Sequence, residues 1–190
     1  MKRARILFAL LAPLLLAACE AVLFTTAVVT AVDVSIDRRT PGRYLDDNRL
    51  ELKLRGVFSS DEALDGVNIS VTVLNGIVLL TGETHSDAQR RRAEELAQEH
   101  PEARKVVNEL QLSGATNLPS RVNDAWITGK VKARLLNVRN FPDSAVKVVT
   151  EHGKVYLLGL VSREEGGIAI AATRRVRGIT HIITVFEYTD

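Results

Sequence analysis

Few side chains in this sequence are suited to chemistry, and their spacing favours binding over catalysis. None of its four histidines, His85, His100, His152 and His181, stands one helical turn from a second metal ligand. Zinc sites use clustered cysteine, histidine and carboxylate ligands, so we predict no metal site and no cofactor. No glycine-rich phosphate loop and no nucleophile elbow is found. We therefore predict no catalytic residue, no enzyme activity and no small-molecule substrate.

Two charged runs have structural interpretations. Asp46 and Asp47 stand just before a predicted helix, where carboxylates cap the free N–H groups and favour the positive end of the helix dipole. The run Arg90 to Arg92 stands beside Glu94 and Glu95, which indicates a solvated helix face. We therefore expect no nucleic-acid partner.

The only cysteine, Cys19, follows a segment with the features of an export signal. The first five residues contain three basic side chains, and residues 6–16 are apolar apart from one proline. Leu16-Ala17-Ala18-Cys19 resembles the lipobox of bacterial lipoproteins, in which the cysteine is lipidated and becomes the new N-terminus. We therefore predict a signal peptide over residues 1–18 and lipidation of Cys19.

Two alternatives to the lipobox remain open. One is a plain signal followed by a buried thiol. The other is an uncleaved anchor from Ile6 to Val32, in which Glu20 would cost about 2.5–3.5 kcal/mol at mid-membrane. An aspartate after the lipidated cysteine is the usual inner-membrane retention signal in enterobacteria. Because Glu20 stands there instead, we expect the outer membrane rather than the inner membrane, with the chain facing the periplasm.

The sequence beyond the signal repeats itself. Asn75-Gly76 and His152-Gly153 lie 77 residues apart, as do Gly82 and Gly159. Past these glycines the offset is 76, which a single deletion in one loop explains. The matching apolar positions include Leu50, Leu54, Phe58, Val71, Val106 and Leu110 in the first copy, and Ile127, Val131, Leu135, Val148, Ile182 and Phe186 in the second.

Each copy is predicted to fold as helix, strand, strand, helix, strand. The first helix has apolar residues at i, i+4 and i+8, which form a narrow buried stripe. The strand from Val67 to Val73 alternates apolar and polar residues. Asn75-Gly76 predicts a tight hairpin, because both residues tolerate positive φ, and His152-Gly153 is a weaker version of it.

The second helix of each copy is predicted from a capping signature. Ser86 with Gln89 precedes a helix over Ala88–Glu99, and Ser162 with Glu165 precedes one over Glu164–Arg175. The fold class is therefore α+β, with two tandem domains, each a three-stranded mixed sheet covered by two helices. The predicted segments are a signal peptide (1–18), a lipidated N-terminus and spacer (19–45), a first domain (46–113), a linker (114–120) and a second domain (121–190).

The repeated unit resembles the BON domain, with Gly76 and Gly153 in the hairpins and Gly82 and Gly159 closing the second strands. The most similar stretches are Asn123–Thr128 and Gly153–Val161. Two copies behind a lipobox resemble dual-BON lipoproteins of the Gram-negative outer membrane. The resemblance implies a protein that binds phospholipid or another envelope surface, supports outer-membrane integrity and has no catalytic centre.

The two predicted domains differ in charge. Residues 46–113 contain eight basic and thirteen acidic side chains, whereas residues 121–190 contain eleven basic and seven acidic ones. A Lys or Arg placed near an anionic leaflet contributes about 1 kcal/mol to binding. We therefore predict that the second domain, and not the first, contacts an anionic membrane.

Trp126 is predicted to lie outside the core. On a helix from Asp124 to Leu136 it lies about 140° from the middle of the buried stripe. Its counterpart in the first copy is Arg49, a residue type that is rarely buried. Indole rings favour the headgroup boundary of membranes, so Trp126 is a candidate membrane contact. The cations predicted to attract phosphate groups with it are Lys130, Lys132, Arg134 and Arg139.

Two interpretations of this helix remain open. In the first, it docks on anionic phospholipid while Cys19 supplies the tether. In the second, Trp126 packs against the other domain or the spacer. The alternative function is an adaptor that recruits an envelope assembly factor or a peptidoglycan-associated protein as its partner.

Overall fold

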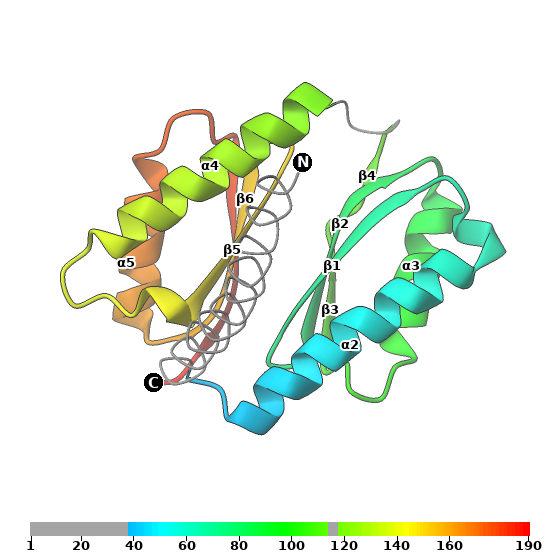
Figure 1. Cartoon of the computed structure of the whole chain (residues 1–190), viewed down its shortest axis with the longest axis horizontal. Coiled ribbons are helices and arrows are strands. Elements are labelled where there is room, and N and C mark those ends of the chain that lie inside the picture. Colours follow the sequence, from blue (N-terminus) through cyan, green and yellow to red (C-terminus); the bar gives the residue numbers. More distant parts are fainter. Residues whose placement is uncertain (1–37, 114–117) are drawn as a thin grey trace, which may run out of the picture. The chain divides into compact units, whose positions relative to one another are not determined.

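The computed structural model describes residues 38–113 and 118–190 (Figure 1). The signal peptide, Cys19 and most of the spacer lie outside these residues, as does most of the predicted linker. Within the described ranges, no helix has both the length and the apolar character that a membrane span needs.

The first domain begins with α2 (Pro41–Ser60), which Thr40 caps by accepting a hydrogen bond from the Arg43 N–H. A short 3-10 turn (Glu62–Leu64) leads into the antiparallel strands β1 (Asn68–Leu74) and β2 (Ile77–Thr84). Helix α3 (Asp87–Gln98) follows, and β3 (Lys105–Asn108) and β4 (Gln111–Leu112) pair parallel with β2. The predicted third strand is thus interrupted, where the side chain of Asn108 accepts the Leu110 N–H.

The second domain repeats this order. Helix α4 (Leu118–Leu136) and a 3-10 turn (Asp143–Ala145) precede the antiparallel strands β5 (Val146–Glu151) and β6 (Lys154–Val161). Helix α5 (Arg163–Arg174) then leads to β7 (His181–Tyr188), which pairs parallel with β6. In each domain both helices cover one face of the sheet (Figure 1). The α+β fold class predicted from the sequence is confirmed.

The predicted cores are confirmed. Leu50, Leu54 and Phe58 are buried with β1 and β2 residues in one cluster, and their counterparts Ile127, Val131 and Leu135 are buried in another. The helix starts differ from prediction, because α2 begins at Pro41 and α4 at Leu118. Residues 41–45 and 118–120, assigned to the spacer and the linker, are therefore helical.

Both hairpins have the predicted tight turn. Asn75 and Gly76 have φ values of 52° and 74°, and His152 and Gly153 have 50° and 72°. At Gly82, the neighbouring strand leaves no space for a side chain. A Cβ there would collide with the carbonyl of Asn68, at the start of the paired strand. The matching Gly159 faces the carbonyl of Ala145 in the same way.

The predicted capping role of Asp46 and Asp47 is wrong. Both lie inside α2, and Asp47 is buried, where its two carboxylate oxygens accept the N–H groups of Asn75 and Gly76 at 2.6 and 2.8 Å. Asp124 of α4 accepts the N–H groups of His152 and Gly153 at 2.9 and 2.8 Å. An aspartate thus ties the first helix of each domain to its hairpin. The bonded residues are 28 or 29 positions apart in the sequence.

The sheet faces not covered by helices pack against each other. Leu74, Ile77 and Leu79 of the first domain are buried in one cluster with Tyr156, Leu158 and Val185 of the second. The Tyr156 hydroxyl donates to Glu109 of the first domain at 3.3 Å. Burial, followed by the nearby Glu109 carboxylate, raises the pKa of Tyr156 well above its ordinary value. This phenol therefore stays protonated and remains a hydrogen-bond donor between the domains.

Candidate membrane-binding surface

Trp126 lies on the outward side of α4. Its side chain is 51% exposed, whereas Ile127, the next residue, is fully buried. The Lys130 ammonium lies over the indole ring, with Nζ 3.4 Å from the ring centroid. Such a cation–π contact holds a positive charge beside the ring without removing it from solvent. The ring and the charge are therefore presented to solvent together.

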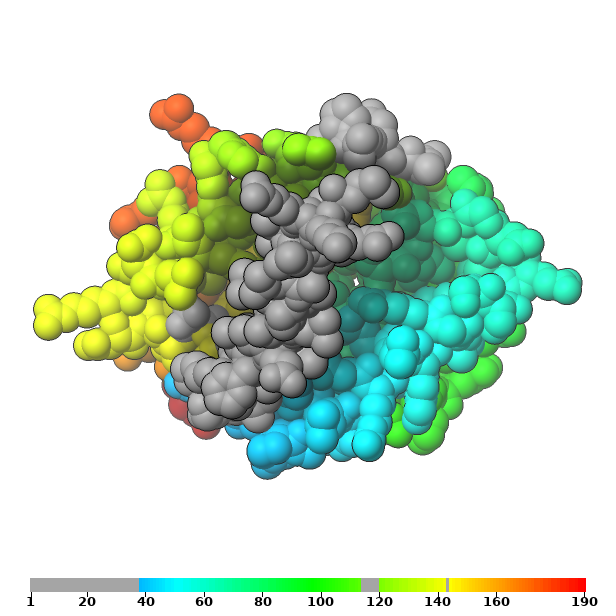
Figure 2. Space-filling model, in the orientation of Figure 1, coloured from blue at the N-terminus to red at the C-terminus, as the bar shows by residue number. Residues whose placement is uncertain are grey.

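Trp126 belongs to a stripe of exposed small and apolar residues along α4. The stripe has the spacing 4, 3, 4, 3, which keeps its members on one side of a helix. Its large members besides Trp126 are Val122, 63% exposed, and Leu136, 64% exposed. Side chains of α4 lie on the molecular surface in Figure 2, coloured lime to yellow. The five residues, called the outer stripe below, are Val122, Trp126, Gly129, Ala133 and Leu136.

Cations flank the outer stripe. By the 3.6-residue period, Lys130 and Arg134 lie on one side of it and Lys132 on the other. All three are exposed, and none forms an ion pair with a carboxylate of residues 38–113 or 118–190. A charge without an ion-pair partner keeps its full attraction for an external anion. The outer stripe therefore has a positive border.

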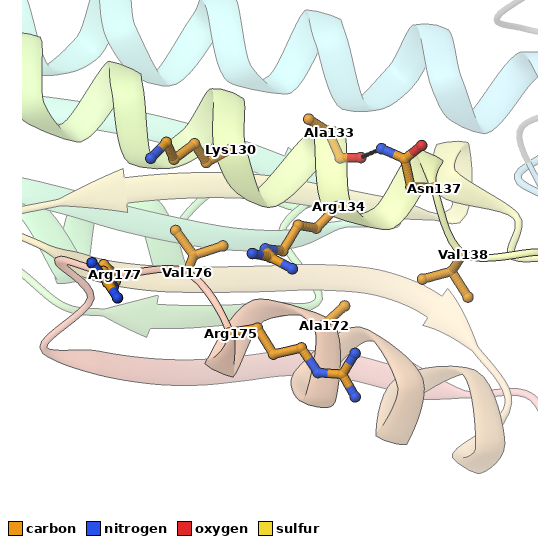
Figure 3. Close-up of a pocket in the computed structure, with 9 residues that line it drawn as sticks. All are labelled: Lys130, Ala133, Arg134, Asn137, Val138, Ala172, Arg175, Val176 and Arg177. Atoms are coloured by element: carbon orange, nitrogen blue, oxygen red, sulfur yellow. Dashed lines mark hydrogen bonds between the residues drawn. The ribbon is translucent and has the colours of Figure 1, made fainter.

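A basic pocket lies on the Arg134 side, between α4 and the end of α5. Its volume is about 780 Å³, and Figure 3 shows the Arg134 guanidinium extending into the space between the two helices. Arg175 and Arg177 bring two more guanidinium groups to its lining, together with Lys130. At the far end, the Asn137 amide donates to the Ala133 carbonyl at 2.6 Å and so closes the last turn of α4.

The structure brings together only some of the residues singled out in the sequence. Trp126, Lys130 and Arg134 share one surface, whereas Lys132 lies across the outer stripe and Arg139 lies in the loop after α4. Sequence reasoning missed Val122 and Leu136, although their spacing from Trp126 was a signal. It also missed Arg175 and Arg177, which join the surface only through the packing of α5 beside α4.

Comparison with known proteins agrees with the repeated fold. The profile of the family described as "BON domain" matches residues 46–114 and 123–190. The chain is 29% identical over 180 residues to "Outer membrane lipoprotein DolP" of Haemophilus influenzae, covering 94% of this chain and 93% of that protein.

Two further relatives match most of the chain. "21 kDa hemolysin" of Actinobacillus pleuropneumoniae is 31% identical over 156 residues, covering 82% of this chain and 80% of that protein. "Osmotically-inducible protein Y" of Escherichia coli is 27% identical over 154 residues, covering 80% and 76%. The likeness therefore spans both repeated units.

Proposed function

Because the chain belongs to the BON domain family, we propose that it is an envelope lipoprotein whose second BON domain docks on anionic phospholipid membranes through α4. The likeness to an outer membrane lipoprotein over nearly the whole chain supports the envelope assignment. The observation that carries the proposal is the outer stripe, an exposed apolar line on α4 bordered by cations that no carboxylate of the described residues pairs with.

The arrangement on α4 suits a helix that lies in a membrane interface. Its opposite side is anchored in the domain core through Ile127 and Val131, so docking requires no unfolding. An apolar line bordered by Lys and Arg partitions at the boundary of headgroups and acyl chains, where indole is favoured. Lys130, Lys132 and Arg134 each add about 1 kcal/mol near an anionic leaflet.

The basic pocket adds a place for a phosphate group. Guanidinium groups bind phosphate oxygens in pairs of parallel hydrogen bonds. Arg134, Arg175 and Arg177 line a space large enough for a lipid headgroup. A headgroup bound there would hold α4 against the leaflet while the outer stripe contacts the acyl region.

The lipid anchor and the docking surface serve one purpose in this proposal. A lipoprotein anchor carries more than one acyl chain and attaches the protein firmly, whereas an amphipathic helix bordered by cations adds a reversible contact that depends on the lipid. We place the anchor at Cys19 in the outer membrane, facing the periplasm, and the reversible contact at α4. The anchor sets where the protein is, and the second domain sets which lipids it contacts.

Vesicle binding tests the proposal, with the unacylated mature chain as the protein. It should bind vesicles containing phosphatidylglycerol and leave pure phosphatidylcholine vesicles unbound. Trp126→Ala should weaken binding at least tenfold, since it removes the largest interfacial side chain. Arg49→Ala, the matched change in the first domain, should leave binding unchanged. Equal affinities of Trp126→Ala and the wild-type chain would refute the insertion model.

A second variant separates docking from a general loss of fold. A Cβ added at Gly129 meets no atom within 4 Å, so Gly129→Asp introduces a charge into the outer stripe without a clash. We expect it to abolish vesicle binding and leave the thermal unfolding midpoint within about 2 °C of wild type, since isolated surface changes have small effects. Leu52→Asp, at the matching position of α2, should leave both vesicle binding and the unfolding midpoint unchanged.

A further inference from the structure

Three potential metal ligands meet between the two domains. Glu83, at the end of β2, lies beside Glu151 and His152, in the hairpin of the second domain. One ligand atom from each lies within 4.8 Å of the other two. The sequence predicted no metal site, because Glu83 stands 69 residues before His152 and belongs to the other copy of the repeat. Their proximity results from the packing of the two sheets.

Glu83 is held in place as a metal ligand would be. Its side chain is 1% exposed, and its Oε2 accepts a hydrogen bond from the Asn68 amide at 2.8 Å. Its other oxygen, Oε1, lies 2.7 Å from Nε2 of His152. The Asn68 amide thus fixes one oxygen of Glu83, as outer hydrogen bonds do for metal ligands, and leaves Oε1 on the side of the imidazole.

The hairpin that presents Glu151 and His152 is equally fixed. Asp124 binds the N–H groups of His152 and Gly153, which pins the turn to α4. His152 has a φ of 50°, a conformation for which asparagine is the common residue and which Asn75 adopts at the same position of the first hairpin. The second hairpin thus places an imidazole where the first has an amide.

The cluster is negatively charged. The buried Glu83 carboxylate and the half-buried Glu151 carboxylate, beside one imidazole, attract a divalent cation because it relieves their repulsion. A cavity of about 330 Å³ lined by Glu151, Asp124 and Asn68 adjoins the cluster and has room for water ligands.

We propose that Glu83, Glu151 and His152 together bind one divalent transition-metal cation, zinc in preference to calcium or magnesium. An imidazole nitrogen with two carboxylate oxygens suits zinc, whereas calcium and magnesium take oxygen ligands alone. Tetrahedral zinc ligands at about 2.0–2.2 Å from the metal lie more than about 3 Å from one another. The hydrogen bond between Glu83 and His152 would therefore open, and Nε2 would offer its lone pair to the cation. Because the ligands come from both domains, the cation joins them. This site is independent of the outer stripe and of membrane docking.

Metal titration of the tag-free full chain in detergent tests the proposal. Zinc should bind one to one by calorimetry, and cobalt should give the visible absorption of a low-coordinate site. His152→Asn should weaken zinc binding at least tenfold while preserving the turn, because asparagine already occupies this position in the first hairpin. His181→Asn, which alters an exposed histidine of β7, is the matched control and should bind zinc as wild type does.

Two further variants keep the result interpretable. Asn68→Ala should weaken zinc binding about tenfold, as loss of an orienting hydrogen bond does at metal sites. Glu83→Gln should weaken it at least as much, with metal-free circular dichroism establishing that the variant is folded. Absence of one-to-one zinc binding by the wild-type chain would overturn the proposal. So would wild-type affinity in folded His152→Asn and Glu83→Gln.

Discussion

Helices α2 and α4 occupy the same position in the two domains, but they differ in how their charges are used. Both bury an i, i+4, i+8 stripe, and both tie an aspartate to the hairpin. On α2, Arg49 pairs with Asp46, Arg55 pairs with Glu51 at 2.6 Å, and Lys53 pairs with Glu102 at 3.3 Å. These three cations of α2 are therefore paired with carboxylates of their own domain.

The carboxylates that neutralise α2 are missing from the matching positions of the second domain. Asn123, Thr128 and Gly178 stand where the first domain has Asp46, Glu51 and Glu102. Two basic positions are the same in both domains: Lys130 corresponds to Lys53, and Lys132 corresponds to Arg55. At the third basic position, Trp126 stands in place of Arg49. In our proposal, the second domain gains its binding surface because these ion-pair partners are absent, while the buried stripe and the hairpin anchor are kept in both domains.

The largest expected effect tests what the two domains share. Asp47→Ala and Asp124→Ala each leave two backbone N–H groups of a hairpin without their charged acceptor, one of them on a buried glycine. We expect each to lower the free energy of unfolding by about 3 kcal/mol. Urea unfolding measures this. Asp46→Ala, a change at a half-exposed ion pair, should lower it by less than about 0.5 kcal/mol.

Similar losses of unfolding free energy for Asp47→Ala and Asp124→Ala would sharpen the comparison. They would mean that the hairpin anchor is equivalent in the two domains and that the domains differ in their surfaces. A loss below about 1 kcal/mol in either variant would mean that the aspartate does not anchor its hairpin.

The next effect tests the charge difference. The double variant Lys130→Ala/Arg134→Ala should weaken binding to phosphatidylglycerol vesicles about 30-fold, since two cations near an anionic leaflet contribute about 2 kcal/mol. Lys53→Ala/Arg55→Ala in the first domain should change the affinity less than twofold, because both cations are already paired. Cosedimentation at constant ionic strength compares them. Equal losses of vesicle affinity in both double variants would contradict the proposed difference between the cations of α2 and those of α4.

A smaller effect tests the outer stripe. Leu136 and Leu52 are exposed to similar extents, 64% and 71%, on α4 and α2. Leu136→Ala should weaken vesicle binding about fivefold, which corresponds to about 1 kcal/mol of apolar contact. Leu52→Ala should have no effect, because α2 does not face the membrane in our proposal. Reduced binding by both variants would indicate that either helix can dock.

The sequence predicts the fold better than it predicts the surface. The repeat, the buried stripes and the hairpins follow from local periodicity and turn chemistry. The starts of α2 and α4 were not predicted from the sequence. No apolar stripe extends back to Pro41, and α4 begins at Leu118, among residues assigned to the linker. Helix ends depend on local capping more than on periodicity.

The roles that were missed depend on contacts between distant segments. The sequence around Asp47 predicts a helix cap. In the structure, Asp47 instead binds the hairpin, which begins 28 residues later in the chain. Arg175 and Arg177 belong to another part of the chain than Arg134, and only helix packing makes them one pocket. Glu83 and His152 are brought together by the packing of the two domains. A pattern read along one segment cannot supply such contacts.

The smallest expected effect concerns the contact between the domains. Glu187 of β7 accepts hydrogen bonds from Arg104 and Asn75 of the first domain at 2.9 and 2.6 Å. The hydrogen bond from Arg104, together with that from Asn75, holds the pKa of Glu187 below its ordinary value. A lowered pKa stabilises the folded state above the ordinary glutamate pKa, 4.5, and the contribution is lost as the pH falls through the lower folded value.

Glu187→Gln should therefore lower the free energy of unfolding by about 0.5 kcal/mol at pH 7, because this pair is partly exposed. The difference from wild type should shrink as the pH falls below 4.5. Denaturant unfolding at several pH values measures it. A difference that grows toward acid pH would contradict the assigned ion pair.

The most direct test of the account uses Trp126 itself, since it is the only tryptophan in the chain. Its fluorescence should shift to shorter wavelength when vesicles containing phosphatidylglycerol are added, and lipids brominated near the headgroup should quench it more than lipids brominated at the chain ends. Emission that stays unshifted and unquenched while the protein is bound to the vesicles would show that the α4 surface is not the membrane contact.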